Sequence, residues 1–269
     1  MTFRSHLDGS VHRFTPEHAI AVQEALGSDS AVAFDQPVFP SSPTPVVADA
    51  TERTHRWAER SLTAHTRPDQ AIFGIVQGGL DPTLREASTR FIAGLPFDGI
   101  CIGGLAGDET PEERDAALDV AIPLLADDPR PRYLMGLGSP ADLLEAVHRG
   151  VDLFDSVLPA RVARNGQLWV PGGRLNIRNQ RFLDDPEPVQ ADCPCLLCRR
   201  FSRAYLAHLF RARELLAYRL ATCHNLTFTL DFMARIRASI RAGTFPADMP
   251  LLRSRAGRIS GSEVTEQSA

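Results

Sequence analysis

Long apolar runs are absent from this sequence of 269 residues. No stretch approaches the roughly 20 apolar residues of a membrane-spanning helix, and the opening residues, Met1 to His6, lack the apolar core of a secretory signal. Net positive charge and internal repeats are absent too; a formal charge of −4 gives no general attraction to nucleic acid. We therefore expect a cytoplasmic protein without a membrane segment. Its composition, 43% hydrophobic and 23% charged, is that of an ordinary globular chain.

Cysteine is scarce, but three of the five cysteines fall within six residues. Cys193, Cys195 and Cys198 are followed by His224, 26 positions after the last of them. Three thiolates and one imidazole match the tetrahedral ligand preference of Zn²⁺. Core cysteines or a disulfide are the alternatives, but cysteines one residue apart rarely bridge each other, and nothing indicates secretion. The sequence therefore predicts a zinc site.

Short apolar strands alternate with amphipathic helices after a predicted hairpin over 2–7 and 11–14 and a helix to residue 26. We expect strands near 31–34, 71–76, 99–102, 132–135 and 153–157, and helices near 48–64, 82–93, 111–125 and 140–149. Such alternation predicts an α/β protein with parallel βαβ units. Five strands fit the later part of a (β/α)₈ TIM-barrel whose first strands are absent, and a doubly wound open sheet is the alternative.

The pattern changes after Asp155. Alternating segments at 167–170 and 174–177 predict a small antiparallel pair, and helical patterns run from about 202 to 220 and from 226 to 242. Six arginines and one acid lie between Arg199 and Arg219, which indicates either a local basic surface or an ordinary solvated helix face. We expect a partial barrel over 1–160, a zinc-binding subdomain with closing helices over 161–242, and a C-terminal tail over 243–269.

Polar residues follow the predicted strands, at the face where barrel enzymes build active sites. Asp35 and Asp155 are carboxylates that can act as base, ligand or nucleophile, although either can also cap a loop. Gln77 precedes two glycines, and Gly103 and Gly104 form another pair. Paired glycines let backbone groups approach a flat ligand, and a glutamine amide can read it, although tight turns use glycine too.

Several segments together resemble the tRNA-guanine transglycosylases. They are FRSHLDGSVHRFTPE, GIVQGG, IGGLAG, YLMGLG, GVDLFDSVLPARVARNG and CPCLLCRRFSRAYLAHL, followed by His224-Asn225-Leu226. They occur in family order over almost the whole length. The resemblance implies a (β/α)₈ barrel with a zinc subdomain. It also implies a pentosyltransferase of queuosine tRNA modification, which exchanges the wobble guanine of GUN-type anticodons for a 7-deazaguanine base, queuine or its precursor.

The resemblance also implies roles for individual residues. Asp155 matches the nucleophile, which attacks ribose C1′ and forms a covalent aspartyl–RNA intermediate. Base-binding positions are matched by Asp35, Gln77, Gly104, Leu105 and Met135. The RNA-binding arginines near the anticodon loop are matched by Arg161 and Arg164. Ligands of one structural zinc ion are matched by Cys193, Cys195, Cys198 and His224. A homodimer formed near the zinc region is a further expectation.

The sequence also departs from the family pattern. The family has an SDSGGFQ-like segment before the hairpin, which supplies a general acid/base aspartate and an aromatic opposite Met135, and this sequence begins after it. We therefore expect the isolated chain to expose sheet edges and to be unstable or prone to aggregation. Gly107 stands where bacterial members often carry valine, which favours the bulkier queuine. Other departures are Pro37, Ser156 and Val162.

Two other classes of function stay open. A non-catalytic tRNA-binding or partner subunit of a transglycosylase would keep the zinc site and the arginines but exchange no base. An unrelated zinc-bearing barrel hydrolase would lose its activity on zinc removal while its fold stayed intact.

Overall fold

A computed structural model of the chain describes residues 1–257. These residues form two compact units. The barrel unit comprises Met1–Gly136 and Ala146–Asp155, and the zinc unit comprises Leu137–Glu145 and the residues from Ser156 onward. Among the described residues, no helix combines the length and the apolar character needed to cross a membrane.

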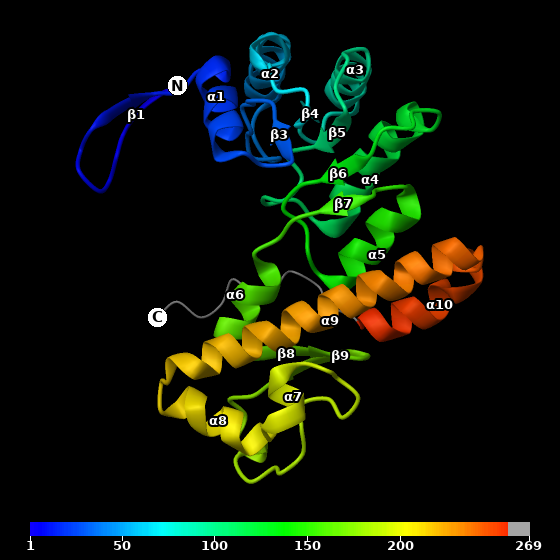
Figure 1. Ribbon diagram of the computed structural model, residues 1–269. Helices are drawn as coiled ribbons and strands as arrows, with labels where there is room; N and C mark the ends of the chain where they lie inside the picture. The colour runs from blue at the N-terminus through cyan, green and yellow to red at the C-terminus, as the bar shows by residue number, and fades with distance from the viewer. Residues whose placement is uncertain (258–269) are drawn as a thin grey trace. The chain divides into compact units, whose positions relative to one another are not determined.

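A parallel sheet of five strands forms the centre of the barrel unit (Figure 1). Its strands are adjacent in chain order: β3 (Ser30–Val32), β4 (Ala71–Val76), β5 (Gly99–Ile102), β6 (Arg132–Leu134) and β7 (Leu153–Phe154). The register places Phe73 opposite Gly99 and Tyr133 opposite Leu153. Each strand overlaps its predicted range. Three of them, β3, β6 and β7, end before the predicted limit, so the polar residues that follow lie beyond the strand ends.

The helices of this unit begin at strong start signals. They are α1 (Pro16–Leu26), α2 (Thr44–Ala64), α3 (Pro82–Ala93) and α4 (Pro111–Ala121), and α5 (Pro140–Arg149) is divided between the two units. Thr15, Asp81 and Thr110 each accept hydrogen bonds from backbone N–H groups of the first turn, and a proline follows each. The predicted helix over 111–125 changes at Ile122 to a 3₁₀ turn, η1 (Ile122–Leu125), which contains Pro123.

Successive helices pack against each other in a single row. Helix α1 packs on α2, α2 on α3, and α3 on α4. A doubly wound sheet has helices on both faces, so a single row excludes that alternative. The parallel sheet and its row of helices fit an incomplete (β/α) barrel.

The two faces of β4 contact different cores. Ile72 and Val76 pack with helix residues into one apolar cluster. Phe73 and Ile75 belong to a second cluster, against which Tyr133 and Met135 pack. Since side chains alternate along a strand, this strand separates the helix layer from the inner face of the sheet. Burial on both faces explains its continuous apolar sequence.

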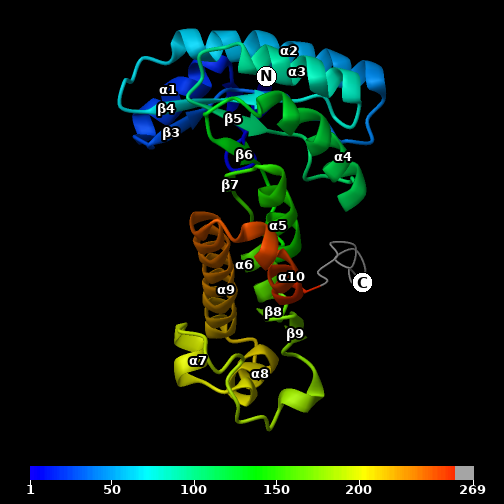
Figure 2. The ribbon, with the colours of Figure 1, turned by 90° about the vertical axis from the view of Figure 1, so that its right-hand side faces the viewer.

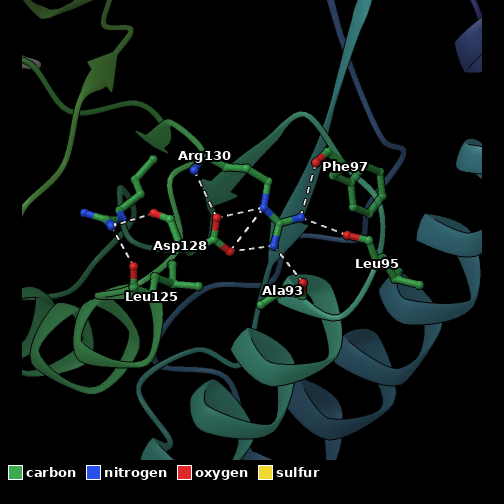
Figure 3. Close-up of polar contacts among 7 residues, drawn as sticks. Ala93, Leu95, Phe97, Leu125, Asp128 and Arg130 are labelled. Atoms are coloured by element: carbon green, nitrogen blue, oxygen red, sulfur yellow. Dashed lines mark hydrogen bonds and ion pairs between the residues drawn. The ribbon is translucent and has the colours of Figure 1, made fainter.

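Arg130 ties together the connections at the amino ends of the strands (Figure 3). Its guanidinium donates to the backbone carbonyls of Ala93 at 2.7 Å, Leu95 at 2.8 Å and Phe97 at 3.2 Å. The same group pairs with Asp128 at 2.5 Å. One side chain thereby joins the α3–β5 connection to the η1–β6 connection, on the side of the sheet away from the polar strand ends.

Two antiparallel hairpins complete the strands. The predicted N-terminal hairpin is present as β1 (Thr2–Arg4) and β2 (Val11–Arg13) in the barrel unit, and β8 (Gln167–Val170) with β9 (Gly173–Asn176) forms the predicted pair in the zinc unit. The zinc unit also contains α6 (Leu158–Arg164), η2 (Gln180–Phe182), α7 (Leu196–Arg200), α8 (Arg203–Arg211), α9 (Leu215–Ala242) and α10 (Phe245–Ala256). Helix α9 packs against α6, α7, α8 and α10 (Figure 2).

The helices after the zinc cluster differ from the prediction. The chain breaks at 212–214 rather than at 221–225, because Arg213 adopts a left-handed conformation, with φ of 57°. Asn225 lies within α9, where its amide bonds the backbone of Pro159, Gln167 and Trp169 instead of ending a helix. Helices α6, α7 and α10 were not predicted. Helix α10 lies within the predicted C-terminal tail over 243–269, of which residues 258–269 lie outside the described residues.

Candidate active site and metal centre

A cavity of about 570 Å³ opens at the carboxyl ends of the sheet in the barrel unit. Its lining includes one predicted residue from beyond each of the five strands: Asp35, Gln77, Gly104, Met135 and Asp155. The structure therefore brings together five residues spread over 121 positions of sequence. Leu105 is buried, with 1% of its surface exposed, and does not line the cavity.

Gln77 and Asp35 form a polar pair on the cavity wall. The Gln77 Nε2 group donates to Asp35 Oδ2 at 2.7 Å, and the glutamine is 2% exposed. Burial raises the pKa of Asp35, while the hydrogen bond from Gln77 acts to lower it. The pair offers amide and carboxylate atoms to any ligand in the cavity, the combination that reads the edges of a heterocycle.

The glycine pairs make room for protein groups. A Cβ at Gly103 would lie 2.7 Å from Gln77 Nε2, and one at Gly104 would lie 2.6 Å from Gln77 Oε1. At Gly78, with φ of 122°, a Cβ would lie 2.6 Å from the backbone nitrogen of Arg85 on α3. The glycines thus let the Gln77 amide lie directly against the turn after β5, and let α3 approach the turn after β4.

Asp155 is exposed at the cavity, and two protein groups bind one of its two carboxylate oxygens. Its Oδ1 accepts from the Tyr133 hydroxyl at 2.7 Å and from the Gly136 N–H at 2.9 Å. Within residues 1–257, no protein group donates to Oδ2, so this oxygen is available to a ligand. The pKa of Tyr133 is raised by burial and by its hydrogen bond to Asp155, so the phenol keeps the proton that it donates.

Tyr133 has no predicted role, yet it touches the predicted nucleophile. The signal for it is the two-residue strand period, since Tyr133 and Met135 share one face of β6 and its continuation. Both residues line the cavity. Met135 is partly buried against the inner-face cluster, a position from which its side chain can contact the face of a flat ligand.

The loop after β3 forms another part of the wall. Phe39, 69% exposed, and Pro40 both line the cavity, and Ser41 donates to the Asp108 carboxylate through its N–H and its hydroxyl. A Cβ at Gly107 would lie 2.9 Å from Pro40 Cδ. Gly107 itself lines the cavity, and a larger residue at this position would have to displace Pro40. The preference for a bulkier base stays a prediction.

The predicted zinc ligands come together in the zinc unit. The Sγ atoms of Cys193, Cys195 and Cys198 lie 3.7, 3.6 and 3.3 Å from Nδ1 of His224. Tetrahedral Zn²⁺ with ordinary Zn–S and Zn–N bonds spaces such atoms by about 3.5 Å. All five cysteines of the chain are free, which excludes the disulfide alternative.

The surroundings of His224 suit a metal. Its ring is fully buried, and Nε2 lies 2.8 Å from the backbone oxygen of Trp169. This contact favours the tautomer with the proton on Nε2, which leaves the Nδ1 lone pair directed to the thiols. The four residues therefore fit one zinc ion.

Arg161 and Arg164 lie in the last turn of α6, and both are exposed. Between them Val162 and Ala163 are buried in the zinc unit. The helix thus fixes the backbone of two side chains that reach solvent, and each can contact an anion.

Comparisons with known proteins agree with these features. A family model described as queuine tRNA-ribosyltransferase matches residues 1–255. The chain is 52% identical over 240 residues to a queuine tRNA-ribosyltransferase of Herpetosiphon aurantiacus, with 89% of this chain and 61% of the relative covered. The corresponding protein of Symbiobacterium thermophilum is 52% identical over 248 residues, with 90% and 61% covered. That of Pelotomaculum thermopropionicum is 51% identical over 244 residues, with 90% and 65% covered.

The chain thus spans a little under two thirds of the length of these relatives. The matched region includes the strand ends around the cavity as well as the zinc ligands. Identity of this level over almost the whole chain establishes kinship: the chain belongs to the queuine tRNA-ribosyltransferase family.

Proposed function

We propose that this chain carries the base-exchange site of a tRNA-guanine transglycosylase, which replaces a guanine of tRNA by a 7-deazaguanine base. The observation that carries the proposal is the single cavity in which Asp155, Asp35 and Gln77 meet. One carboxylate is free to attack, while the other is paired with an amide suited to a purine edge.

Covalent catalysis by Asp155 is the proposed chemistry. Its Oδ2 forms a bond to ribose C1′ as the C1′–N9 bond breaks, and the electron pair of that bond leaves with the guanine. The incoming base then attacks C1′ through N9 as the C1′–Oδ2 bond breaks, which restores the carboxylate. The N9 proton that this base gives up balances the proton that the released guanine takes up. Donation from Tyr133 and Gly136 to Oδ1 supports this role, because it fixes the carboxylate before reaction.

Recognition of the base is assigned to the opposite wall. Asp35 accepts from the ring N–H and the exocyclic amine, while Gln77 and the backbone N–H of Gly104 donate to the carbonyl edge. Met135 covers one face of the base. Leu105 does not line the cavity, and its backbone C=O stays only a predicted partner of the substituent side. A base with the wrong edge would leave these buried groups unpaired, which is the basis of strong discrimination.

The zinc unit is proposed to hold the RNA. Its described residues carry 16 arginines and nine acids, a net charge of +7, whereas the barrel unit carries 12 arginines and 22 acids. A basic unit of this kind attracts phosphates, and Arg161 and Arg164 are the proposed contacts. One zinc ion, when bound by the three cysteines and His224, cross-links α7 to α9 and performs no chemical step. A homodimer remains a prediction.

A covalent-adduct experiment tests the proposal. The chain is incubated with a radiolabelled tRNA anticodon stem-loop, denatured and resolved by gel electrophoresis. We expect a labelled protein band that Asp155→Asn abolishes and that the exposed control Asp127→Asn retains. If the unaltered chain shifts the RNA in native gels but forms no adduct, the result would instead favour the non-catalytic tRNA-binding subunit. An adduct that survives Asp155→Asn would overturn the nucleophile assignment.

A further inference from the structure

The described residues contain one arginine without any exposed surface, Arg85 on α3. Its guanidinium forms hydrogen bonds only to backbone carbonyls in this part of the chain. Nε and Nη2 donate to Gly79 O at 3.2 and 2.5 Å, and Nη1 donates to Gly103 O at 3.0 Å and to Val76 O at 3.5 Å. Burying a guanidinium without a directly paired carboxylate is costly, so it calls for a reason other than stability.

The carbonyls of Gly79 and Gly103, which accept the shorter of these bonds, belong to the turns that carry the base-reading groups. Gly79 lies two residues after Gln77, and Gly103 immediately precedes Gly104. These turns follow neighbouring strands, β4 and β5. Because the guanidinium is a rigid planar fork, simultaneous bonds to both carbonyls fix the distance between the turns.

Helix α3 also holds the glutamine itself. Ser88, one turn beyond Arg85, accepts a hydrogen bond from the backbone N–H of Gln77 at 3.0 Å. The Gln77 amide in turn lies against Gly104 so closely that no Cβ fits there. A movement of either turn would therefore shift the amide and the Gly104 N–H relative to each other. Burial lowers the pKa of Arg85 to about 10, so the fork remains charged at neutral pH.

We infer that Arg85 is a positioning residue for recognition of the carbonyl edge of the base, acting through the carbonyls of Gly79 and Gly103. The inference rests on the proposed function. It assigns Arg85 to the carbonyl edge, because the turns that Arg85 joins carry the Gln77 amide and the Gly104 N–H. Asp35, which reads the opposite edge, follows a different strand and contacts this pair through Gln77 Nε2.

Base selectivity tests this role. Equilibrium dialysis measures binding of radiolabelled guanine, and competition against it measures 6-thioguanine and hypoxanthine. 6-Thioguanine replaces the carbonyl oxygen by a weaker acceptor, and hypoxanthine lacks the exocyclic amine. We expect Arg85→Met to reduce the guanine preference over 6-thioguanine by about tenfold, the loss of one well-placed hydrogen bond. The preference over hypoxanthine should stay within about twofold. Arg90→Met, on the exposed side of the same helix, should change neither ratio.

Arg85→Lys provides a second variant in case Arg85→Met does not fold. A lysine keeps the charge but cannot bond both carbonyls in one plane. We therefore expect its guanine preference over 6-thioguanine to lie between that of the unaltered chain and that of Arg85→Met. The sequence contains no lysine, so this substitution introduces its only ε-amine. Resistance of that amine to acylating reagents reports that residue 85 is still buried.

These binding measurements distinguish failure of the Arg85 role from failure of the proposed base site. If the unaltered chain binds no guanine, the proposed base site fails. If it binds guanine selectively and a folded Arg85 variant keeps the full preference over 6-thioguanine, the role of Arg85 fails while the base site stands. An equal loss of both preferences would also overturn it, because that is the result of general damage to the site.

Discussion

The Tyr133 hydroxyl donates to Oδ1 of Asp155 over 2.7 Å, across the neighbouring strands β6 and β7. The Gly136 N–H donates to the same oxygen. Two donors on one oxygen orient the carboxylate and leave Oδ2 for the attack that we propose. A carboxylate held in this way need not reorient in the proposed reaction.

Replacing Tyr133 by phenylalanine should slow adduct formation with the RNA stem-loop. Without this bond the carboxylate is held less firmly in one orientation, and misplacement of a reacting group costs up to about a hundredfold in rate. Guanine binding should persist, since the recognition wall is unchanged. Tyr205→Phe, a partly exposed tyrosine of α8 in the zinc unit, is the matched control. An unchanged single-turnover rate in Tyr133→Phe would show that the bond has no part in the chemistry.

Features with a local sequence signal were predictable. The zinc cluster depends on ligand types within a short segment, and the strand ends depend on apolar runs that stop at Asp35, Gln77 and Asp155. A parallel sheet then places those ends side by side, so the meeting of the predicted residues at one cavity follows from strand order alone.

Features that depend on packing were not predictable. Arg85 reads as an ordinary polar residue of an amphipathic helix, and only the approach of the turns after β4 and β5 makes it a buried donor. The break near Arg213 is a second case, because Asn225 looks like a helix end until its tertiary bonds are known. The closeness of Gly107 to Pro40 is a third, since Pro40 belongs to a loop distant in sequence.

Asp35→Asn should raise thermal stability at neutral pH while abolishing selective guanine binding. Burial raises the pKa of Asp35, so the folded chain holds this proton more tightly than the unfolded chain. Its contribution to stability is therefore present in acid and lost as the pH rises through the folded pKa. The difference in Tm between the variant and the unaltered chain should be largest near pH 7 and should shrink on acidification.

Asp69 is the control, because its pKa is shifted in the opposite direction to that of Asp35. Its pKa is lowered by the hydrogen bond from Arg67, so Asp69→Asn should bring no gain in Tm at neutral pH. Melting curves between pH 5 and 8 measure both variants. A lower Tm for Asp35→Asn than for the unaltered chain at pH 7 would show that its bond with Gln77 outweighs the cost of burial.

Arg130→Met should destabilise the barrel unit without affecting base selectivity. The substitution removes the guanidinium that three partly buried carbonyls and Asp128 share. Leu95 O keeps the Phe97 N–H and Asp128 keeps the backbone N–H of residue 130, whereas a buried group left without a donor costs about 1–3 kcal/mol. We expect a net loss of about 2–4 kcal/mol in urea unfolding. Arg56→Met removes only an exposed helix pair with Glu52 and should cost less than about 0.5 kcal/mol. Equal urea midpoints for the two variants would show that the bonds of Arg130 to these two connections do not stabilise the unit.

Zinc removal distinguishes a structural ion from a catalytic one. A structural zinc site contributes on the order of 10 kcal/mol to the fold that holds it, so Cys198→Ser should eliminate bound zinc and much of the helical signal of the zinc unit. Gel shifts with the RNA should weaken in parallel, while guanine binding in the barrel unit persists, because none of the cavity residues belongs to the zinc unit. Cys223→Ser is the control, since this cysteine precedes His224 but lies outside the ligand cluster. Metal content and circular dichroism measure both variants.

A Cys198→Ser chain that keeps its helical signal but forms no adduct would assign the ion to chemistry, as in a zinc-bearing hydrolase. Loss of fold and RNA binding together, with guanine still bound, would assign it to the RNA-holding unit.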